Sequence, residues 1–274
     1  MASGSRFLGS ITDAAPVRLG RHPAGDDAMA RDASASADGA MLFTQAALEY
    51  AAHRPGEALT IVQAGCTTAG ADLDLDALRA SGRDVTLTML DNDDEVTRAV
   101  LAGRPDLRPA VLGDLRAVPL LPRSADIVQC CLLLDRISHA ELVLGRLVDV
   151  LRPGGLLLVR TADRETAAGF LDRALPRRLR ALTWRSLRPG EPGPYPAVYE
   201  QLTSARGIQQ FAGRRGLVIS RRDVCSRLDG RSRRPVIRAA RRLVAVATRG
   251  RLTAAHDELR YVIRRPVDRF ARVL

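Results

Sequence analysis

The residues with the clearest chemical potential lie in a small-residue stretch in the first third of the chain. Gly65, Cys66 and Thr67 follow the apolar run of residues 59–64, and a helical pattern begins near Asp72. A strand, a tight turn and a helix in this order bring a helix N-terminus and unhindered backbone N–H groups close to a ligand. Thr67 can also cap that helix and donate a hydrogen bond. An ordinary turn between a strand and a helix has the same composition, so later segments must decide.

A carboxylate follows the second apolar run. Asp91 and Asn92 end the run of residues 85–90. An acidic residue roughly 20 residues after the glycine turn, at the end of the second parallel strand, is placed to bind ribose hydroxyls. The structural alternative for Asp91 is to cap the helix that follows.

Two further pairs of residues end later apolar runs. Asp114 and Leu115 follow the run of residues 109–112, and Asp135 and Arg136 follow the run of residues 127–134. The structural alternatives are a turn residue for Asp114, a helix cap for Asp135 and a solvated side chain for Arg136.

These runs alternate with helical patterns, which indicates a parallel sheet covered by helices on both faces. We expect a helix over residues 41–53 before the first strand. Another helix is expected from Leu142 to Leu151, ended by a turn at residues 152–155 that leads into a fifth strand.

The order and spacing of these segments resemble the class I S-adenosylmethionine-dependent methyltransferases, most closely over residues 41–163. The resemblance implies an α/β fold: a Rossmann-like, doubly wound sheet of about seven strands, mostly parallel with the last strand antiparallel. It also implies S-adenosyl-L-methionine as the cofactor and methyl transfer as the reaction.

The resemblance assigns roles to individual residues. Asp91 would bind the ribose hydroxyls, Asp114 the adenine side, and Leu115 the ring. The implied cofactor-binding set is Gly65, Cys66, Thr67, Asp91, Asn92, Asp114 and Leu115. Asp135 and Arg136 fall where the family meets the cofactor sulfur and the substrate. Neither a catalytic residue nor a metal site is identified.

The glycine loop departs from the family pattern. Gln63 stands at the position that is usually acidic, and Thr67 and Ala69 replace two of the usual glycines. Gln63 accepts hydrogen bonds but offers no charge to the cofactor's ammonium group. The methyl groups of Thr67 and Ala69 narrow the approach, so the loop is a degenerate form of the motif.

The rest of the chain divides into three parts. We expect residues 1–40, rich in Ala, Gly, Ser and Asp, to form a mobile leader, and residues 41–274 to form the methyltransferase-like domain. Residues 165–203 are expected to be an inserted helix and a Pro/Gly-rich lid. Tyr195 and Tyr199 in this lid either line a substrate pocket or fix the loop in place.

The final third combines a helical pattern with many arginines. Residues 235–249 predict an amphipathic helix, with Val236, Ala240, Leu243, Val244 and Ala247 on the packed face and Arg238, Arg241, Arg242 and Arg249 on the opposite face. A strand is expected at residues 216–220 and a last strand at residues 259–264.

Charge is distributed unevenly. Residues 1–165 contain 17 Arg and 23 Asp and Glu, a net charge of −6, whereas residues 166–274 contain 25 Arg and 8 Asp and Glu, a net charge of +17. The chain contains no Lys, which indicates a compositional bias. A half with this charge attracts polyanions or an anionic membrane surface.

Cysteine content and targeting signals indicate the compartment. Four Cys without metal-ligand spacing, no signal peptide and no run long enough to span a membrane favour the cytoplasm.

Three functions remain compatible with the sequence. The first is methyl transfer to a small-molecule acceptor, supported by the ordered motifs. The second is a methyltransferase-like fold without transfer activity that serves as a binding or scaffold protein, supported by the altered loop. The third is an Arg-rich methyltransferase associated with RNA or a membrane surface, supported by the charge of the C-terminal half.

Overall fold

The structure is a computed structural model, and it leaves part of the chain undescribed. It describes residues 41–54, 58–65, 72–103, 109–187, 194–226 and 235–267, without the side chains of residues 183–187 and 235–237. The expected leader of residues 1–40 lies outside the described residues, as do Cys66 and Thr67.

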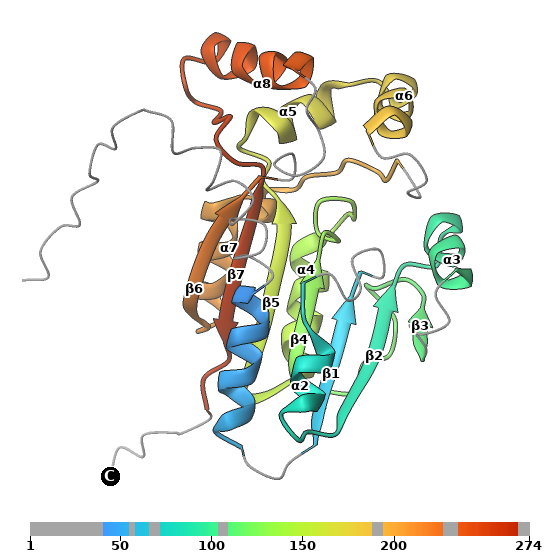
Figure 1. The fold of residues 1–274 in the computed structure, drawn as a ribbon, viewed down its shortest axis with the longest axis vertical. Helices are drawn as coiled ribbons and strands as arrows, with labels where there is room; N and C mark the ends of the chain where they lie inside the picture. Colours follow the sequence, from blue (N-terminus) through green and yellow to red (C-terminus); the bar gives the residue numbers. More distant parts are fainter. Residues whose placement is uncertain are drawn as a thin grey trace, which may run out of the picture.

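The described residues form one seven-stranded sheet (Figure 1). Its strands are β1 (Leu59–Ala64), β2 (Val85–Asp91), β3 (Ala110–Leu112), β4 (Ala125–Cys131), β5 (Leu151–Ala162), β6 (Val218–Cys225) and β7 (Glu258–Arg264). They lie in the order β3-β2-β1-β4-β5-β7-β6. The first five strands are parallel, and β7 is antiparallel to both β5 and β6. The predicted doubly wound sheet with an antiparallel last strand is therefore confirmed.

Helices cover both faces of this sheet. They are a helix over residues 41–52, α2 (Leu75–Ala80), α3 (Glu95–Ala102), α4 (Ala140–Val150), α5 (Ala167–Ala174), α6 (Arg177–Leu187), α7 (Ala205–Arg214) and α8 (Pro235–Ala247), with a short 3-10 turn, η3 (Gln201–Thr203). On one face α4 and α7 enclose a core with Leu144 and Phe211. On the other, the helix over residues 41–52 and α2 enclose a core with Phe43 and Leu78.

Three helices form a cap beyond one edge of the sheet. α5, α6 and α8 lie past the ends of β5 and β7, on the side where the parallel strands have their carboxyl ends (Figure 1). α5 packs against α8. The expected insertion at residues 165–203 supplies α5 and α6, and α8 joins them from much later in the chain.

Side-chain caps start several of these helices. Asp74, Asp94, Thr166 and Ser204 precede α2, α3, α5 and α7, and each accepts a hydrogen bond from a backbone N–H in the first turn. Such caps satisfy donors that lack a partner within the helix. The sequence therefore defines these helix starts locally.

Three strand boundaries differ from the sequence prediction. The strand predicted at residues 216–220 is β6, which runs from Val218 to Cys225. The fourth strand was predicted to run to Leu134, but β4 ends at Cys131 because Leu132 adopts a left-handed backbone with φ of 48°. The turn predicted at residues 152–155 lies within β5, which begins directly after α4. The register between β4 and β5 shifts there, so the strand accommodates Gly154 at φ of 81° as an irregularity.

The orientation of α8 also differs from the prediction. Arg241 was predicted on the outer face, yet it is 6% exposed and forms an ion pair with Asp257 at 2.5 Å. Leu243 was predicted on the packed face, yet it is 72% exposed. The helix has two apolar sides, and the buried ion pair selects the one that faces the protein.

Candidate functional site

The residues singled out from the sequence converge at the carboxyl ends of β1, β2 and β4. The chain adds strands outwards from β1 to β3 on one side of the sheet and then from β4 to β5 on the other. The strand order therefore reverses between the neighbours β1 and β4. Ligands of open α/β sheets bind in the crevice outside such a reversal. Gly65 follows β1, Asp91 ends β2, and Arg136 follows β4 by five residues, so the three flank this point.

Gly65 sits where no other residue fits. Its φ of 97° is a left-handed conformation, and a Cβ atom there would lie 2.5 Å from the carbonyl oxygen of Cys131. The same Cβ position is 3.5 Å from a terminal guanidinium nitrogen of Arg136. The Gly65 N–H donates to the Leu90 carbonyl at 2.9 Å, which joins the end of β1 to β2. The backbone of β1 thus approaches β4 and Arg136 closely because the side chain is absent.

Gln63 fills the position just before this turn. Its side chain is buried, and its amide nitrogen donates to the Gly65 carbonyl at 3.3 Å. The residue that is acidic in the family is here a neutral donor that holds the turn. Arg136 places a positive charge close to Gly65.

Asp91 ends β2 and is 2% exposed. One carboxylate oxygen accepts a hydrogen bond from the Asn92 N–H at 2.8 Å. The Asp91 carbonyl accepts from the Gly113 N–H at 3.2 Å, which joins the ends of β2 and β3. The helix that follows is capped by Asp94, so the structural alternative of a capping role for Asp91 does not apply.

Asp114 and Leu115 occupy different environments. The carboxylate of Asp114 lies at the surface and forms a two-pronged contact with Arg116, with the closest pair at 2.8 Å. This contact, followed by the Arg116 backbone N–H, lowers the pKa of Asp114 to about 2. Leu115 is buried in the core shared with α4 and α7. Asp114 must leave Arg116 before it can contact a ligand.

The turn after β4 carries Asp135 and Arg136. The left-handed Leu132 and a hydrogen bond from the Arg136 N–H to the Leu133 carbonyl at 3.1 Å reverse the chain. Arg136 is 8% exposed, and its guanidinium lies over the ring of Tyr195, 4.3 Å from the ring centroid. The turn therefore brings Arg136 next to Gly65, with the ring of Tyr195 stacked on its guanidinium.

Three charged groups of this site affect the buried thiol of Cys130. Burial, and then the charge of Asp135, raise the pKa of the Cys130 thiol far above its ordinary range. Arg136 opposes this shift and Asp91 adds to it. Both carboxylates and the guanidinium thus act on one buried atom in β4.

Tyr199 and Glu200 fix the segment that covers this turn. The N–H groups of Val198 and Tyr199 donate to the Asp135 carbonyl at 2.9 and 3.1 Å. The Tyr199 hydroxyl donates to Asp172 on α5 at 3.0 Å, and the side chain is 6% exposed. Glu200 accepts from the first N–H groups of α4, at His139 and Ala140. Tyr195 therefore faces the site, whereas Tyr199 anchors the segment.

A buried ionic network near the glycine turn was missed from the sequence. Arg160 on β5 contacts Asp72 and Glu258, each at 2.6 Å, and the two carboxylates are 2% and 0% exposed. Asp72 begins the described chain after the turn, so the network ties that point to β5 and β7. The sequence does contain a sign of this network. Arg160 and Glu258 are charged residues within strands whose other residues are mostly apolar, and charged residues are rarely buried unless they are paired.

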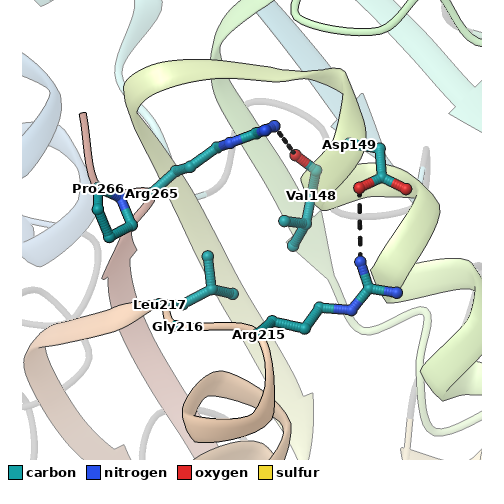
Figure 2. A pocket seen from close by; sticks show the side chains of 7 residues that line it. All are labelled: Val148, Asp149, Arg215, Gly216, Leu217, Arg265 and Pro266. Carbon is teal, nitrogen blue, oxygen red and sulfur yellow. Dashed lines mark hydrogen bonds and ion pairs between the residues drawn. The ribbon is translucent and has the colours of Figure 1, made fainter. Parts of the chain in front are cut away.

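A hollow at the opposite edge of the sheet is separate from this site. It has a volume of about 440 Å³ and is lined by Val148, Asp149, Arg215, Gly216, Leu217, Arg265 and Pro266 (Figure 2). Arg215 contacts Asp149 at 3.4 Å, and Arg265 donates to the Val148 carbonyl at 3.1 Å. Both arginines are held by the protein, Arg215 by the Asp149 carboxylate and Arg265 by the carbonyl oxygens of Val148 and Leu151.

In the described ranges, no three or more His, Cys, Asp or Glu side chains gather in a way that could hold a metal ion. No helix in the part of the chain that the structure describes is long and apolar enough to cross a membrane.

The middle of the chain is similar in sequence to a known protein family. Residues 62–159 match the family model of a methyltransferase domain, a segment that runs from within β1 to within β5. A search of curated protein sequences found no match. The matched segment contains Gly65, Asp91, Asp114, Asp135 and Arg136.

Solved structures agree on the fold. A protein of Galdieria sulphuraria assigned as a sarcosine dimethylglycine methyltransferase is 14% identical, with 88% of this chain and 91% of that chain covered and a TM-score of 0.51. The CurJ carbon methyltransferase is also 14% identical, with 88% of this chain and 56% of that chain covered and a TM-score of 0.50. The predicted resemblance to class I methyltransferases is therefore confirmed, in sequence over residues 62–159 and in fold.

Proposed function

Starting from a methyltransferase domain with the class I fold, we propose that this chain binds S-adenosyl-L-methionine and transfers its methyl group to a small-molecule acceptor. The observation that carries the proposal is the convergence of Gly65, Asp91 and Arg136 on the reversal point between β1 and β4. Nucleotide-like ligands bind at that place in this class of sheet.

The residues present fit the cofactor. Asp91 is a buried carboxylate at a strand end, suited to accept hydrogen bonds from two ribose hydroxyls. Gly65 leaves the backbone bare beside Arg136. Asn92, Asp114 and Leu115 would contribute on the adenine side, and Cys66 and Thr67 would complete the turn. When bound, the cofactor supplies an electrophilic methyl group on a sulfonium.

Arg136 gives this site a positive charge close to the glycine turn, where the family has an acidic residue. The family's acidic residue is replaced by Gln63, and a guanidinium lies next to Gly65. A guanidinium recognises a carboxylate by paired hydrogen bonds. We therefore assign Arg136 to the carboxylate end of the cofactor's methionine moiety.

The acceptor would enter beneath the cap. Tyr195 stacks on Arg136, and Asp135 is 9% exposed in the same turn. Methyl transfer needs in-line positioning more than covalent assistance, so these side chains would act by orienting the acceptor. Cys130, Cys131 and Cys225 are free and buried, which suits a reducing compartment such as the cytoplasm.

Calorimetric titration of the full chain with S-adenosylmethionine and with its demethylated product tests the proposal. We expect binding near micromolar Kd, about −8 kcal/mol. No heat and no thermal shift at millimolar ligand would reject the proposal and favour the second function.

The second function is a methyltransferase-like fold that binds a partner without transferring methyl groups. The neutral Gln63 in the turn favours it, because the ammonium end of the cofactor loses its usual partner. The two functions differ in the titration, since a scaffold has no requirement for the cofactor.

A further inference from the structure

The cap exposes apolar side chains where a helix of a water-exposed surface usually carries charge. On α8, Leu243 is 72% exposed and Val246 is 78% exposed. On α6, Leu179 and Leu182 are 49% and 63% exposed, and Phe170 of α5 is 41% exposed. We call these five side chains the apolar cap face.

The orientation of α8 is what produces this face. Arg241 points inward and forms its ion pair with Asp257, with both side chains 7% exposed. Burying two charges is costly unless they pair closely, so this pair fixes the rotation of the helix. With Arg241 inside, Leu243 and Val246 must lie outside.

The helices that carry the apolar cap face also carry exposed arginines. The exposed arginines on α6, on α8 and just after α8 are Arg177, Arg178, Arg238, Arg242 and Arg249. Neither α6 nor α8 contains an Asp or a Glu. In Figure 1 α8 is the outermost helix of the cap, on the side away from the sheet.

We propose that the cap docks on an anionic lipid bilayer, with the apolar cap face in the interface and the arginines at the headgroups. Helices that lie in a membrane interface combine exposed Leu or Phe with flanking Arg in this way. Anionic headgroups are complementary to the arginines of α6 and α8, two helices without an Asp or a Glu. The proposal is independent of whether the chain transfers methyl groups.

Two other occupants fit the observations less well. A nucleic acid would use the arginines but gain nothing from Leu243 and Val246. A second copy of this chain would cover the apolar side chains but would bring arginines against arginines, which repel. Of these three occupants, the bilayer is the one that uses both features.

Co-sedimentation of the full chain with vesicles tests the docking. Vesicles of phosphatidylcholine with phosphatidylglycerol are compared with pure phosphatidylcholine, at low and at physiological salt. The wild type is expected to sediment with the anionic vesicles at least tenfold more than with the neutral ones, and less as salt rises.

Paired variants separate the apolar and the charged contributions. Leu243→Ser with Val246→Ser is expected to lower the bound fraction at least tenfold. The control, Leu121→Ser with Leu142→Ser, removes side chains that are 74% and 52% exposed outside the cap and is expected to change nothing.

The contribution of the arginines is tested with a second variant and its own control. Arg238→Gln with Arg242→Gln is expected to reduce binding severalfold. The control, Arg79→Gln with Arg264→Gln, makes the same change in net charge away from the cap. Equal effects of test and control variants would overturn the proposal. Equal binding to neutral and anionic vesicles would also overturn it. So would RNA binding that is unchanged in the serine variants, or self-association without vesicle binding.

Discussion

Asp91 and Arg136 place opposite charges on the two sides of Gly65. Asp91 belongs to β2 and Arg136 follows β4, and β1 with Gly65 lies between these strands. A ligand with hydroxyls at one end and a carboxylate at the other matches this arrangement. The proposed cofactor has both groups, so each residue can be tested against its own part of the ligand.

Removing the Asp91 carboxylate tests the hydroxyl end. Asp91→Ala is expected to weaken cofactor binding by about 1.5–3 kcal/mol, the range for hydrogen bonds to a charged group. The control Asp93→Ala removes a neighbouring carboxylate that is exposed and paired with Arg98 at 2.7 Å. Calorimetry should show the loss for Asp91 only, and an Asp91→Ala protein that binds normally would refute the ribose assignment.

Arg136 can be tested with two ligands that differ by one group. Wild type is expected to bind S-adenosylmethionine at least tenfold more tightly than its decarboxylated form, a difference of about 1.4 kcal/mol. Arg136→Gln should bind the two ligands almost equally, because the carboxylate has lost its partner. If wild type binds both ligands alike, the carboxylate assignment fails while the proposed function stands.

Tyr50 provides a pH prediction that does not depend on any ligand. Its hydroxyl donates to Asp126 at 3.2 Å, and burial followed by the Asp126 charge raises the pKa of Tyr50 from 10.0 to about 12. The folded state therefore holds the proton more tightly than the unfolded state. This contribution is complete below about pH 10 and is lost as the pH rises towards 12.

Urea unfolding across this pH range measures the effect. The free energy of unfolding of the wild type should fall more steeply between pH 10 and pH 12 than that of Tyr50→Phe, which has no proton to lose. Parallel curves for the two proteins would show that Tyr50 titrates as it does in the unfolded chain.

Among the elements, β5 and β7 stabilise the site through Arg160. Burial works to lower the pKa of this guanidinium, but Glu258 and Asp72 raise it well beyond its ordinary range. Arg160 therefore stays charged, and its ion pair with Asp72 holds the start of the described chain after the glycine turn.

Arg160→Met is expected to destabilise the fold by about 3–5 kcal/mol, because it leaves two buried carboxylates without their cation. Arg98→Met, which breaks an exposed ion pair, should cost less than about 1 kcal/mol in the same urea titration. Adding Asp72→Asn and Glu258→Gln should restore part of the loss. A cost for Arg160→Met as small as the control would contradict the structural role of the network.

Sequence patterns predicted those elements whose signal is local. The apolar runs located β1, β2 and β4, and the helical pattern over residues 41–53 located the helix before β1. The orientation of α8 was not predictable from the helix alone. Apolar residues with helical spacing occur on two of its sides, and Asp257, the ion-pair partner of Arg241, lies outside the helix. Long-range partners decide such cases, and a single sequence does not contain them.

In the whole molecule, the acidic and the basic parts of the chain form different regions of the structure. The acidic first part contributes β1 to β5 and the proposed cofactor site, and the Arg-rich part contributes the cap helices α5, α6 and α8. The strand-end position of Asp91 followed from the sequence, because parallel strands end at one edge. Asp135 was expected at a strand end as well, but β4 ends four residues before it, at Cys131. The contact of Arg136 with Gly65 and Tyr195 did not, because it depends on the left-handed turn at Leu132.

Hydrogen exchange with and without S-adenosylhomocysteine, read by peptide, tests the position of the proposed site most directly. A ligand at the carboxyl ends of β1, β2 and β4 should slow exchange in peptides that contain Gly65, Asn92 and Arg136. It should leave peptides around Arg215 and Arg265, at the hollow of Figure 2, unchanged. Protection at that hollow, or no protection at Gly65 and Asn92 under saturating ligand, would contradict the account.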